Sequence, residues 1–162
     1  MVQNKKQAKL LLLGFIIITL LSNNMYSQRS LAIGEWDAHL PYGEGKWVTQ
    51  SAEEIIYSTG LSLLYIDKDD LNPRFVDKVR GLSDVGISRL KYDPFNDQLI
   101  IAYMNSSVDI VRGTEVFNLP FIKENTNILG DRQINDIYVA DAKYAYLSTA
   151  FGIVQLDLQS LE

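Results

Sequence analysis

The sequence predicts an all-β fold, an open arc of about three four-stranded β-propeller blades that make up a truncated propeller. The first observation is a repeated phrase of strand-forming residues at Ser58–Asp67, Ala102–Val111 and Ser148–Asp157. A repeat of about 40–50 residues built from short strands is typical of propeller blades. The second observation is that residues 29–162 lack apolar residues spaced i, i+3, i+4, i+7 over three turns, the pattern of an amphipathic helix.

The repeated phrase defines positions that we expect to be equivalent in packing. Leu64, Val108 and Val154 fall on one position, at spacings of 44 and 46 residues, and all three are predicted to be buried. An error of one residue in this alignment would turn every side chain to the opposite face of its sheet. A second set, two residues further along, comprises Ile66, Ile110 and Leu156.

Residues 1–28 have the pattern of a secretory signal peptide. Three lysines precede Leu10–Leu21, which is twelve residues long and uncharged, and a polar run leads to a predicted cleavage site near Gln28. A helix needs roughly 20 apolar residues to cross a bilayer core of about 30 Å. We therefore expect export through the inner membrane and a mature domain at residues 29–162; the alternative is an uncleaved anchor helix.

The rest of the chain is acidic. The sequence has 15 basic and 20 acidic residues, and the first 28 residues hold three of the basic ones and none of the acidic ones, which leaves 12 against 20. An acidic surface repels phosphate backbones, so nucleic acid is not expected as a partner. The sequence contains no cysteine, which excludes disulfides and thiolate metal sites.

The strands follow in order along three blades, at about residues 46–86, 87–132 and 133–162. Before them, Leu31–Gly45 is an entry segment of turn formers, whose aromatic residues Trp36 and Tyr42 are expected to cover an end of the sheet core or to form a surface contact. The first blade is expected to contain strands 47–49, 54–59, 63–67 and 74–79. Lys68–Pro73 forms the turn before the last strand, because proline cannot donate in a central ladder position.

The second blade is the most complete, with strands expected at 87–92, 99–103, 108–112 and 115–121. Asp93–Asp97 forms a turn, since proline sets φ and Asn and Asp tolerate left-handed backbone. Leu99–Tyr103 is continuously apolar, as expected for a strand buried on both faces. Ile122–Gln133 is predicted to be a polar loop. The third blade has strands at 134–139, 144–149 and 153–158 and lacks its fourth.

Few residues could carry catalysis. His39 is the only histidine, so a Ser–His–Asp triad would have to form in the entry segment. Gly81–Gly86 (GLSDVG) has one residue too many for a G-x-S-x-G nucleophile elbow and follows no strand-to-helix step, so it is interpreted as a turn between blades. No spacing singles out a carboxylate pair for glycoside cleavage. We expect no enzyme activity, no cofactor, and no catalytic or metal-binding residues.

Three further motifs are weak. Asp67–Asn72 begins like a calcium loop but is interrupted at Leu71, which favours an acidic turn. Gly43–Lys46 lacks the first glycine and the Ser/Thr of a P-loop. Asn105–Ser107 matches the N-glycosylation pattern, which is frequent in tight turns.

The sequence resembles the N-terminal propeller of PorZ-type surface proteins, which belong to the type IX secretion system. The segments that carry the resemblance are Gly81–Ile87, Tyr92–Tyr103 and Asn135–Asp157. The resemblance extends from about Trp36 to Leu158. It implies a non-enzymatic outer-membrane component of a cell-surface attachment complex, which binds anionic lipopolysaccharide and delivers it to a PorU-like sortase, with PorV- and PorQ-like proteins as further partners. The repeats are also similar to two-component-regulator propellers, so the alternative is an extracellular sensor domain of a membrane-spanning regulator. No ligand residue can be carried over by position.

Overall fold

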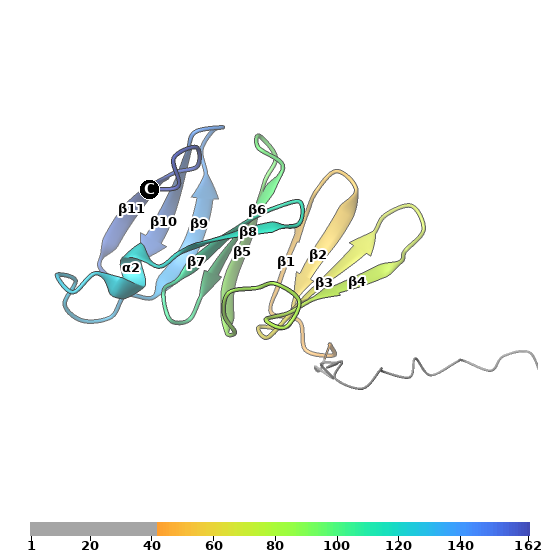
Figure 1. Cartoon of the computed structure of the whole chain (residues 1–162), viewed down its shortest axis with the longest axis horizontal. Helices are drawn as coiled ribbons and strands as arrows, with labels where there is room; N and C mark the ends of the chain where they lie inside the picture. The colour runs from red at the N-terminus through yellow and green to blue at the C-terminus, as the bar shows by residue number, and fades with distance from the viewer. Residues whose placement is uncertain (1–41) are drawn as a thin grey trace, which may run out of the picture. The chain divides into compact units, whose positions relative to one another are not determined.

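The computed structural model describes residues 42–162, which form three antiparallel sheets (Figure 1). The predicted signal peptide, Trp36 and His39 lie outside the described residues. Within residues 42–162, no helix is long and apolar enough to cross a membrane. Neighbouring strands of each sheet are consecutive in the sequence, so each sheet is a simple meander, as in a propeller blade.

The first two sheets have four strands each and the third has three. The first sheet contains β1 (Trp47–Gln50), β2 (Glu54–Ser58), β3 (Leu63–Asp67) and β4 (Pro73–Val76). The second contains β5 (Ile87–Asp93), β6 (Gln98–Tyr103), β7 (Val108–Arg112) and β8 (Glu115–Leu119). The third contains β9 (Ile134–Val139), β10 (Tyr144–Thr149) and β11 (Gly152–Asp157). The prediction of an all-β open arc of blades is confirmed.

Two strands end two or more residues earlier than predicted. β4 stops at Val76 because Asp77 starts a turn, in which its backbone carbonyl and its carboxylate both accept hydrogen bonds from Arg80 N–H. β8 ends at Leu119, and the short helix α2 (Phe121–Glu124) follows within the segment predicted as strand end and loop. Pro120 precedes this helix, as is common at helix starts, and the apolar Ile122 is buried in the core.

The first strands of the three sheets lie next to one another, with β5 in contact with both β1 and β9. Arg89 on β5 connects all three sheets. Its guanidinium lies 4.1 Å from the ring centroid of Trp47 on β1, and its Nε donates to the backbone carbonyl of Asn135 on β9. This arrangement is that of the inner strands of a propeller, and it keeps the arginine occupied by protein groups.

The core consists of two apolar layers, one on each side of the second sheet. β6 is buried along its whole length and supplies both layers. The layer toward the first sheet contains Ile56, Leu63, Tyr65, Leu82, Ile87, Leu99, Ile101 and Tyr103. The layer toward the third sheet contains Ile100, Ala102, Val108, Ile110, Leu119, Ile122, Ile134, Ile137, Ala145, Leu147, Leu156 and Leu158. The prediction that this strand is buried on both faces is confirmed.

The predicted equivalence of Leu64, Val108 and Val154 is wrong by one residue in the second blade. Val108 is buried, but Leu64 and Val154 are only half-buried. Ser58 pairs with Leu63 and Ser148 with Ile153, each across four residues, whereas Ala102 pairs with Val108 across five. The extra residue in the β6–β7 turn shifts the strand, so the equivalent positions are 63, 108 and 153, at spacings of 45 and 45. The second set shifts in the same way, and Val111 replaces Ile110 beside Ile66 and Leu156.

The corrected alignment shows that the two outer faces of the arc are apolar and exposed. On the third sheet, Tyr138 is 64% exposed and Ile153 is 78% exposed. On the first sheet, Val48 is 68% exposed, and Ile55 and Phe75 are also exposed. In addition, the outer edge of β11 has no partner strand among the described residues. Exposed apolar faces and free strand edges favour pairing with other chains.

We therefore expect residues 29–162, expressed as a separate fragment, to associate or aggregate. The driving force is burial of the apolar side chains on the outer faces and pairing of the β11 edge. Sedimentation velocity of the purified fragment measures this directly. A stable monomer that unfolds cooperatively would contradict the prediction and show that three blades are self-sufficient.

Candidate functional site

A cavity of about 290 Å³ opens between the first and second sheets and is the candidate ligand site. It lies where the β1–β2, β5–β6 and β7–β8 turns come together at one end of the two sheets (Figure 1). We refer to it as the inter-blade groove. Its floor is formed by Ile56, Tyr65, Gln98, Leu99 and Val111, and its rim by Ser51, Ala52, Glu53, Glu54, Arg74, Tyr92, Asp97 and Gly113.

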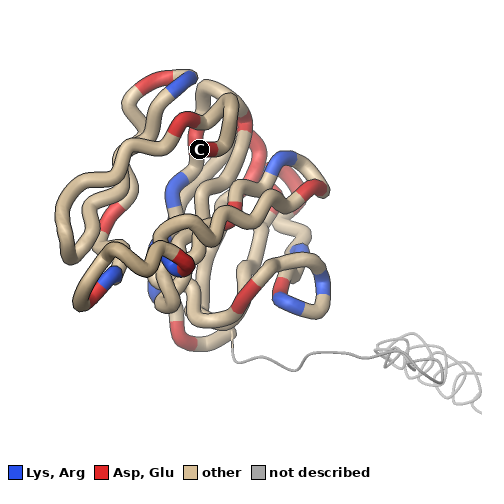
Figure 2. The backbone as a smooth tube through the Cα atoms, turned by 60° about the vertical axis from the view of Figure 1, so that its left-hand side comes forward, with Lys and Arg blue, Asp and Glu red and all other residues tan. Residues whose placement is uncertain are grey.

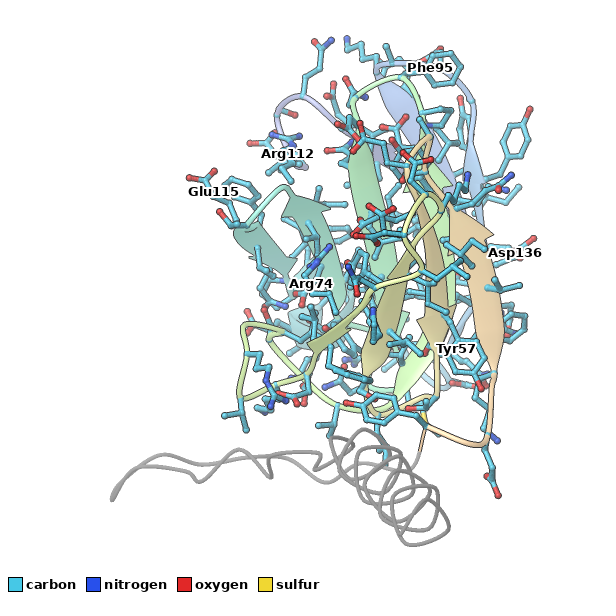
Figure 3. All side chains as sticks on the ribbon, turned by 90° about the vertical axis from the view of Figure 1, so that its right-hand side faces the viewer. Tyr57, Arg74, Phe95, Arg112, Glu115 and Asp136 are labelled. Carbon is cyan, nitrogen blue, oxygen red and sulfur yellow. The ribbon has the colours of Figure 1, made fainter. Side chains whose placement is uncertain are left out.

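Strand pairing builds the side of the groove that belongs to the first sheet. Tyr65 on β3 is directly opposite Arg74 on the edge strand β4. The guanidinium carbon of Arg74 lies 3.9 Å from the ring centroid of Tyr65, a cation–π contact. Arg74 Nη2 also donates to both oxygens of Glu54, at 3.1 and 3.2 Å. The cross-strand pair and the ion pair together fix the rim on this side; Arg74 is labelled in Figure 3.

The β5–β6 turn forms the opposite wall. Asp97 has φ 49°, the left-handed conformation that aspartate tolerates, and accepts a hydrogen bond of 2.6 Å from the Tyr92 hydroxyl. Beneath it, the fully buried Asp93 accepts hydrogen bonds from the backbone N–H of Phe95 and the Gln98 side chain, at 2.9 and 2.7 Å. This network holds the turn in shape while Phe95 projects from the end of the molecule (Figure 3).

The two tyrosines of the groove have raised pKa values for different reasons. Burial raises the pKa of Tyr65 to about 12, against the opposing effect of the nearby Arg74 charge. The hydrogen bond to Asp97 is the main cause that raises the pKa of Tyr92 to about 12. Both hydroxyls are therefore neutral hydrogen-bond donors at neutral pH. The Tyr65 hydroxyl has no hydrogen-bond partner among the described residues.

These shifts predict a loss of stability in alkaline solution. A tyrosine whose pKa is higher in the folded state than its ordinary value of 10 holds its proton more tightly when folded. Its contribution to stability is complete below pH 10 and is lost as the pH rises from 10 to about 12. Urea unfolding along this pH range, with tyrosinate absorbance recorded in parallel, tests the prediction. Equal stability at pH 9 and pH 12 would contradict it.

The groove is negatively charged. It is lined by three carboxylates, those of Glu53, Glu54 and Asp97. The single guanidinium that lines it belongs to Arg74 and forms an ion pair with Glu54. The Lys68 ammonium lies behind the rim, where it donates to the backbone carbonyls of Ser51 and Ala52. Elsewhere, basic and acidic residues are interspersed along the turns (Figure 2).

The described arginines outside the groove are also occupied by protein groups. Arg112 donates from Nε to Gln98 and from Nη2 to the backbone carbonyl of Leu158. Arg132 donates to the backbone carbonyls of Ile128 and Lys123. The Arg112 bonds connect β7 to β6 and to the end of the third sheet, and the Arg132 bonds hold the loop between α2 and β9, so both arginines stabilise the fold.

The Gly81–Gly86 segment is a connection between the first and second sheets, as its sequence predicts. Ser83 donates its backbone N–H to the buried carboxylate of Asp109, at 2.9 Å. Asp84 accepts from the backbone N–H of Val85, which is the main cause that lowers the pKa of Asp84, and forms ion pairs with Lys78 and Lys123. His39 lies outside the described residues.

The other sequence motifs form turns. Asp67 accepts hydrogen bonds from the backbone N–H groups of Asp69 and Asp70, and Leu71 has φ 58°. The same turn recurs after β11, where Asp157 accepts from Gln159 and Ser160 N–H and Leu161 has φ 64°. Asp157 is followed by no further acidic residue before Glu162. The acidic residues of the first turn are therefore not needed for its conformation.

Asn105–Ser107 is the turn between β6 and β7, closed by a hydrogen bond from Ser107 N–H to the Asn105 side chain. Gly43–Lys46 precedes β1, not a helix. Within residues 42–162, no group of three His, Cys, Asp or Glu residues is placed to hold a metal ion. The groove residues were not singled out from the sequence, because Tyr65 lies in the repeated phrase, where it has the pattern of an ordinary core residue.

The comparisons with known proteins agree with the fold. The family model of the N-terminal β-propeller domain of PorZ, of the type IX secretion system, matches residues 56–162. No curated protein matches the sequence. The solved structure of PorZ from Porphyromonas gingivalis, described as an essential bacterial surface component of the type IX secretion system, is similar in fold, with a TM-score of 0.65 and 24% identity.

The similarity to that structure covers 70% of this chain and 15% of the PorZ chain. The family match covers well over half of the sequence and includes most of the first described sheet and all of the second and third. The chain belongs to the family of PorZ N-terminal β-propeller domains.

Proposed function

We propose that the chain is part of a non-enzymatic surface component of the type IX secretion system, which binds anionic lipopolysaccharide and delivers it to a sortase. The observation that carries the proposal is the family match over residues 56–162. PorZ from Porphyromonas gingivalis is described as a bacterial surface component, which supports a place at the outer membrane and cell surface. The same match favours a secretion component over the sensor domain of a two-component regulator.

The structure is compatible with a binding and scaffold role. Propeller sheets offer rigid end surfaces made of turns, and binding sites are often placed on such loops. The inter-blade groove is one such surface, and it is formed by turns of two neighbouring blades. PorU-like, PorV-like and PorQ-like proteins are the proposed partners.

The proposal is tested with an affinity-tagged form of the protein purified from its host cells in mild detergent. We expect anionic lipopolysaccharide and the sortase to co-purify with it. Lipopolysaccharide from a strain that lacks the anionic polysaccharide serves as the control and should not be retained. Equal recovery of both lipopolysaccharides, or recovery of neither, would contradict the proposal.

The non-enzymatic part of the proposal needs a separate measurement. The purified protein is incubated with the retained lipopolysaccharide, and the released sugar, fatty acid and phosphate are measured by mass spectrometry. We expect the lipopolysaccharide to remain intact. Release of any of these products, above that from heat-denatured protein, would show that the protein is an enzyme.

A further inference from the structure

We propose that the inter-blade groove binds a sugar residue that carries neither phosphate nor carboxylate. This assignment rests on the proposed function, because it takes a glycan as the ligand and names the part of the glycan that this groove recognises. Four features of the groove support it: an unpaired buried hydroxyl, the pattern of donors and acceptors, the charge and the size.

The unpaired hydroxyl belongs to Tyr65 on the floor of the groove. Its side chain is only 5% exposed, and its hydroxyl makes no hydrogen bond within the part of the chain that the structure describes. The hydroxyl is not among the polar atoms sealed from solvent, so it faces the open cavity that the side chain lines. Nearly all buried polar groups in proteins have a partner, and a ligand hydroxyl would supply one here.

The groove offers both hydrogen-bond donors and acceptors, which suits the hydroxyl groups of a sugar. The Glu53 carboxylate makes no hydrogen bond to the described residues and is free to accept from a ligand. Tyr65 can donate to the same ligand, and Arg74 retains donors that Glu54 does not use. The apolar floor of Ile56, Leu99 and Val111 offers a surface for the C–H face of a sugar ring.

The negative charge of the groove favours binding of a neutral sugar over an acidic one. A phosphate would lie beside the carboxylates of Glu53, Glu54 and Asp97, and the only guanidinium that lines the groove is already bound to Glu54. Like charges within one small cavity repel one another, and transfer of a phosphate out of water adds an unfavourable desolvation free energy. We infer that the acidic groups of an anionic glycan lie outside this groove.

The size of the cavity limits the ligand to about one ring. At about 290 Å³ it is just below the range for small-molecule sites, roughly 300–1,000 Å³. The turns leave the groove open on the outside, so a longer glycan could place one neutral residue in it and extend away from the protein.

Saturation-transfer NMR on the tagged protein purified from its host cells tests the assignment, because this method tolerates large or associated proteins. The probes are the methyl glycosides of glucose, galactose and N-acetylglucosamine, with glucose 1-phosphate as the acidic analogue. We expect at least one neutral glycoside to bind, and the phosphate to bind more weakly than methyl glucoside. Absence of binding by all three glycosides, or tighter binding of the phosphate, would overturn the assignment.

Variants then locate the site. Tyr65→Phe removes one hydrogen bond and should weaken glycoside binding by about 3- to 10-fold. Tyr57→Phe is the matched control, since Tyr57 lies on the neighbouring strand β2, does not line this cavity and donates its hydroxyl to the Tyr42 carbonyl. It should leave the affinity unchanged. Equal affinities for wild type and Tyr65→Phe would place the sugar elsewhere and overturn the assignment.

A second readout separates this assignment from the proposed function. If Tyr65→Phe loses glycoside binding and the wild-type protein retains anionic lipopolysaccharide, both are supported. If lipopolysaccharide is retained but no glycoside binds, the proposed function stands and the groove assignment fails. If glycosides bind in the groove but lipopolysaccharide is not retained, the groove is a sugar site and the proposed function fails.

Discussion

Replacing Leu63 with alanine is expected to lower the free energy of unfolding by about 2–5 kcal/mol, whereas Ile153→Ala should change it by less than about 0.5 kcal/mol. The two residues occupy the same position in their blades, opposite Ser58 and Ser148. Leu63 is fully buried between the first and second sheets, and Ile153 is 78% exposed. The difference between the two variants therefore measures how much packing against a neighbouring blade contributes to the free energy of unfolding at this position.

The large expected effect at Leu63 has two sources. Truncation loses the transfer free energy of the side chain, and it leaves a cavity that the close-packed layer can fill only in part. Ile153 has no such layer over it within the described residues, so its truncation removes side-chain atoms that already contact solvent. Val108, buried at the same position in the second blade, should behave like Leu63 with a smaller effect, since fewer atoms are removed.

Urea unfolding of the three variants, followed by tryptophan fluorescence and circular dichroism, gives the comparison. Trp47 lies on β1 against Arg89 and reports on the first two sheets. A cost of more than about 1.5 kcal/mol at Ile153, or a near-neutral result at Leu63, would contradict the corrected equivalence. In the first case, another polypeptide segment must cover the outer face of the third sheet.

Most strands could be predicted from the sequence because each depends on local signals. Period-two alternation, Pro and Gly at the turns, and the continuous apolar run at β6 located all eleven strands, nine of them within one residue at both ends. The ends of β4 and β8 were missed because each depends on a specific local interaction. For β4 this is the Asp77 side chain, and for β8 it is the start of α2 at Phe121.

The alignment of the second blade could not be resolved from one sequence. The turn between β6 and β7 has one residue more than its counterparts, Thr59–Ser62 and Thr149–Gly152. The three turns differ in composition, so the sequence does not mark which residue is the additional one. An alignment of the three repeated phrases without a gap therefore placed Val108 at the position of Leu64. Because successive side chains of a strand point to opposite faces of its sheet, this error of one residue assigned the side chains of the second blade to the wrong face. The register of the strands, which is set by the turn length, corrects it.

The groove was not predictable for a different reason. The groove residues Glu53, Glu54, Tyr65, Arg74 and Asp97 come from two turns and three strands. They are brought together by strand pairing in the first sheet and by its packing against the second sheet. Individually, each has an ordinary interpretation, as a solvent-exposed charge or a core aromatic residue. That the Tyr65 hydroxyl has no hydrogen-bond partner among the described residues can be recognised only from the structure around it.

Asp109 on β7 is a buried carboxylate that connects the second sheet to the Gly81–Gly86 segment. It is completely inaccessible to solvent and accepts three hydrogen bonds: from Tyr103 Oη at 2.6 Å, Asn118 Nδ2 at 2.7 Å and Ser83 N at 2.9 Å. Burial is the main cause that raises the pKa of Tyr103 well above its ordinary value, so this hydroxyl stays protonated and continues to donate. Asp109 thus accepts hydrogen bonds from neutral donors of the same sheet and of the connection between blades.

We expect Asp109→Ala to lower the free energy of unfolding by at least about 2 kcal/mol. The change leaves the Tyr103 hydroxyl and the Ser83 N–H without their acceptor, and each buried unpaired group costs about 1–3 kcal/mol. Asn118 is exposed and keeps its hydrogen bond to Ser107 Oγ. Asp131→Ala is the control, because Asp131 is an exposed carboxylate that accepts a single local N–H bond, and it should be close to neutral.

A double-mutant cycle with Tyr103→Phe separates the hydrogen-bond network from simple loss of packing. Tyr103→Phe alone removes one donor, and in the Asp109→Ala background it removes a hydroxyl that no longer has an acceptor. The second substitution should therefore cost less in that background than in the wild type, with a coupling of about 0.5–3 kcal/mol. Additive costs would show that Asp109 acts through its volume alone. A coupling of this size, measured by urea unfolding, would show that a charged residue on β7 holds the Gly81–Gly86 connection through its hydrogen bonds.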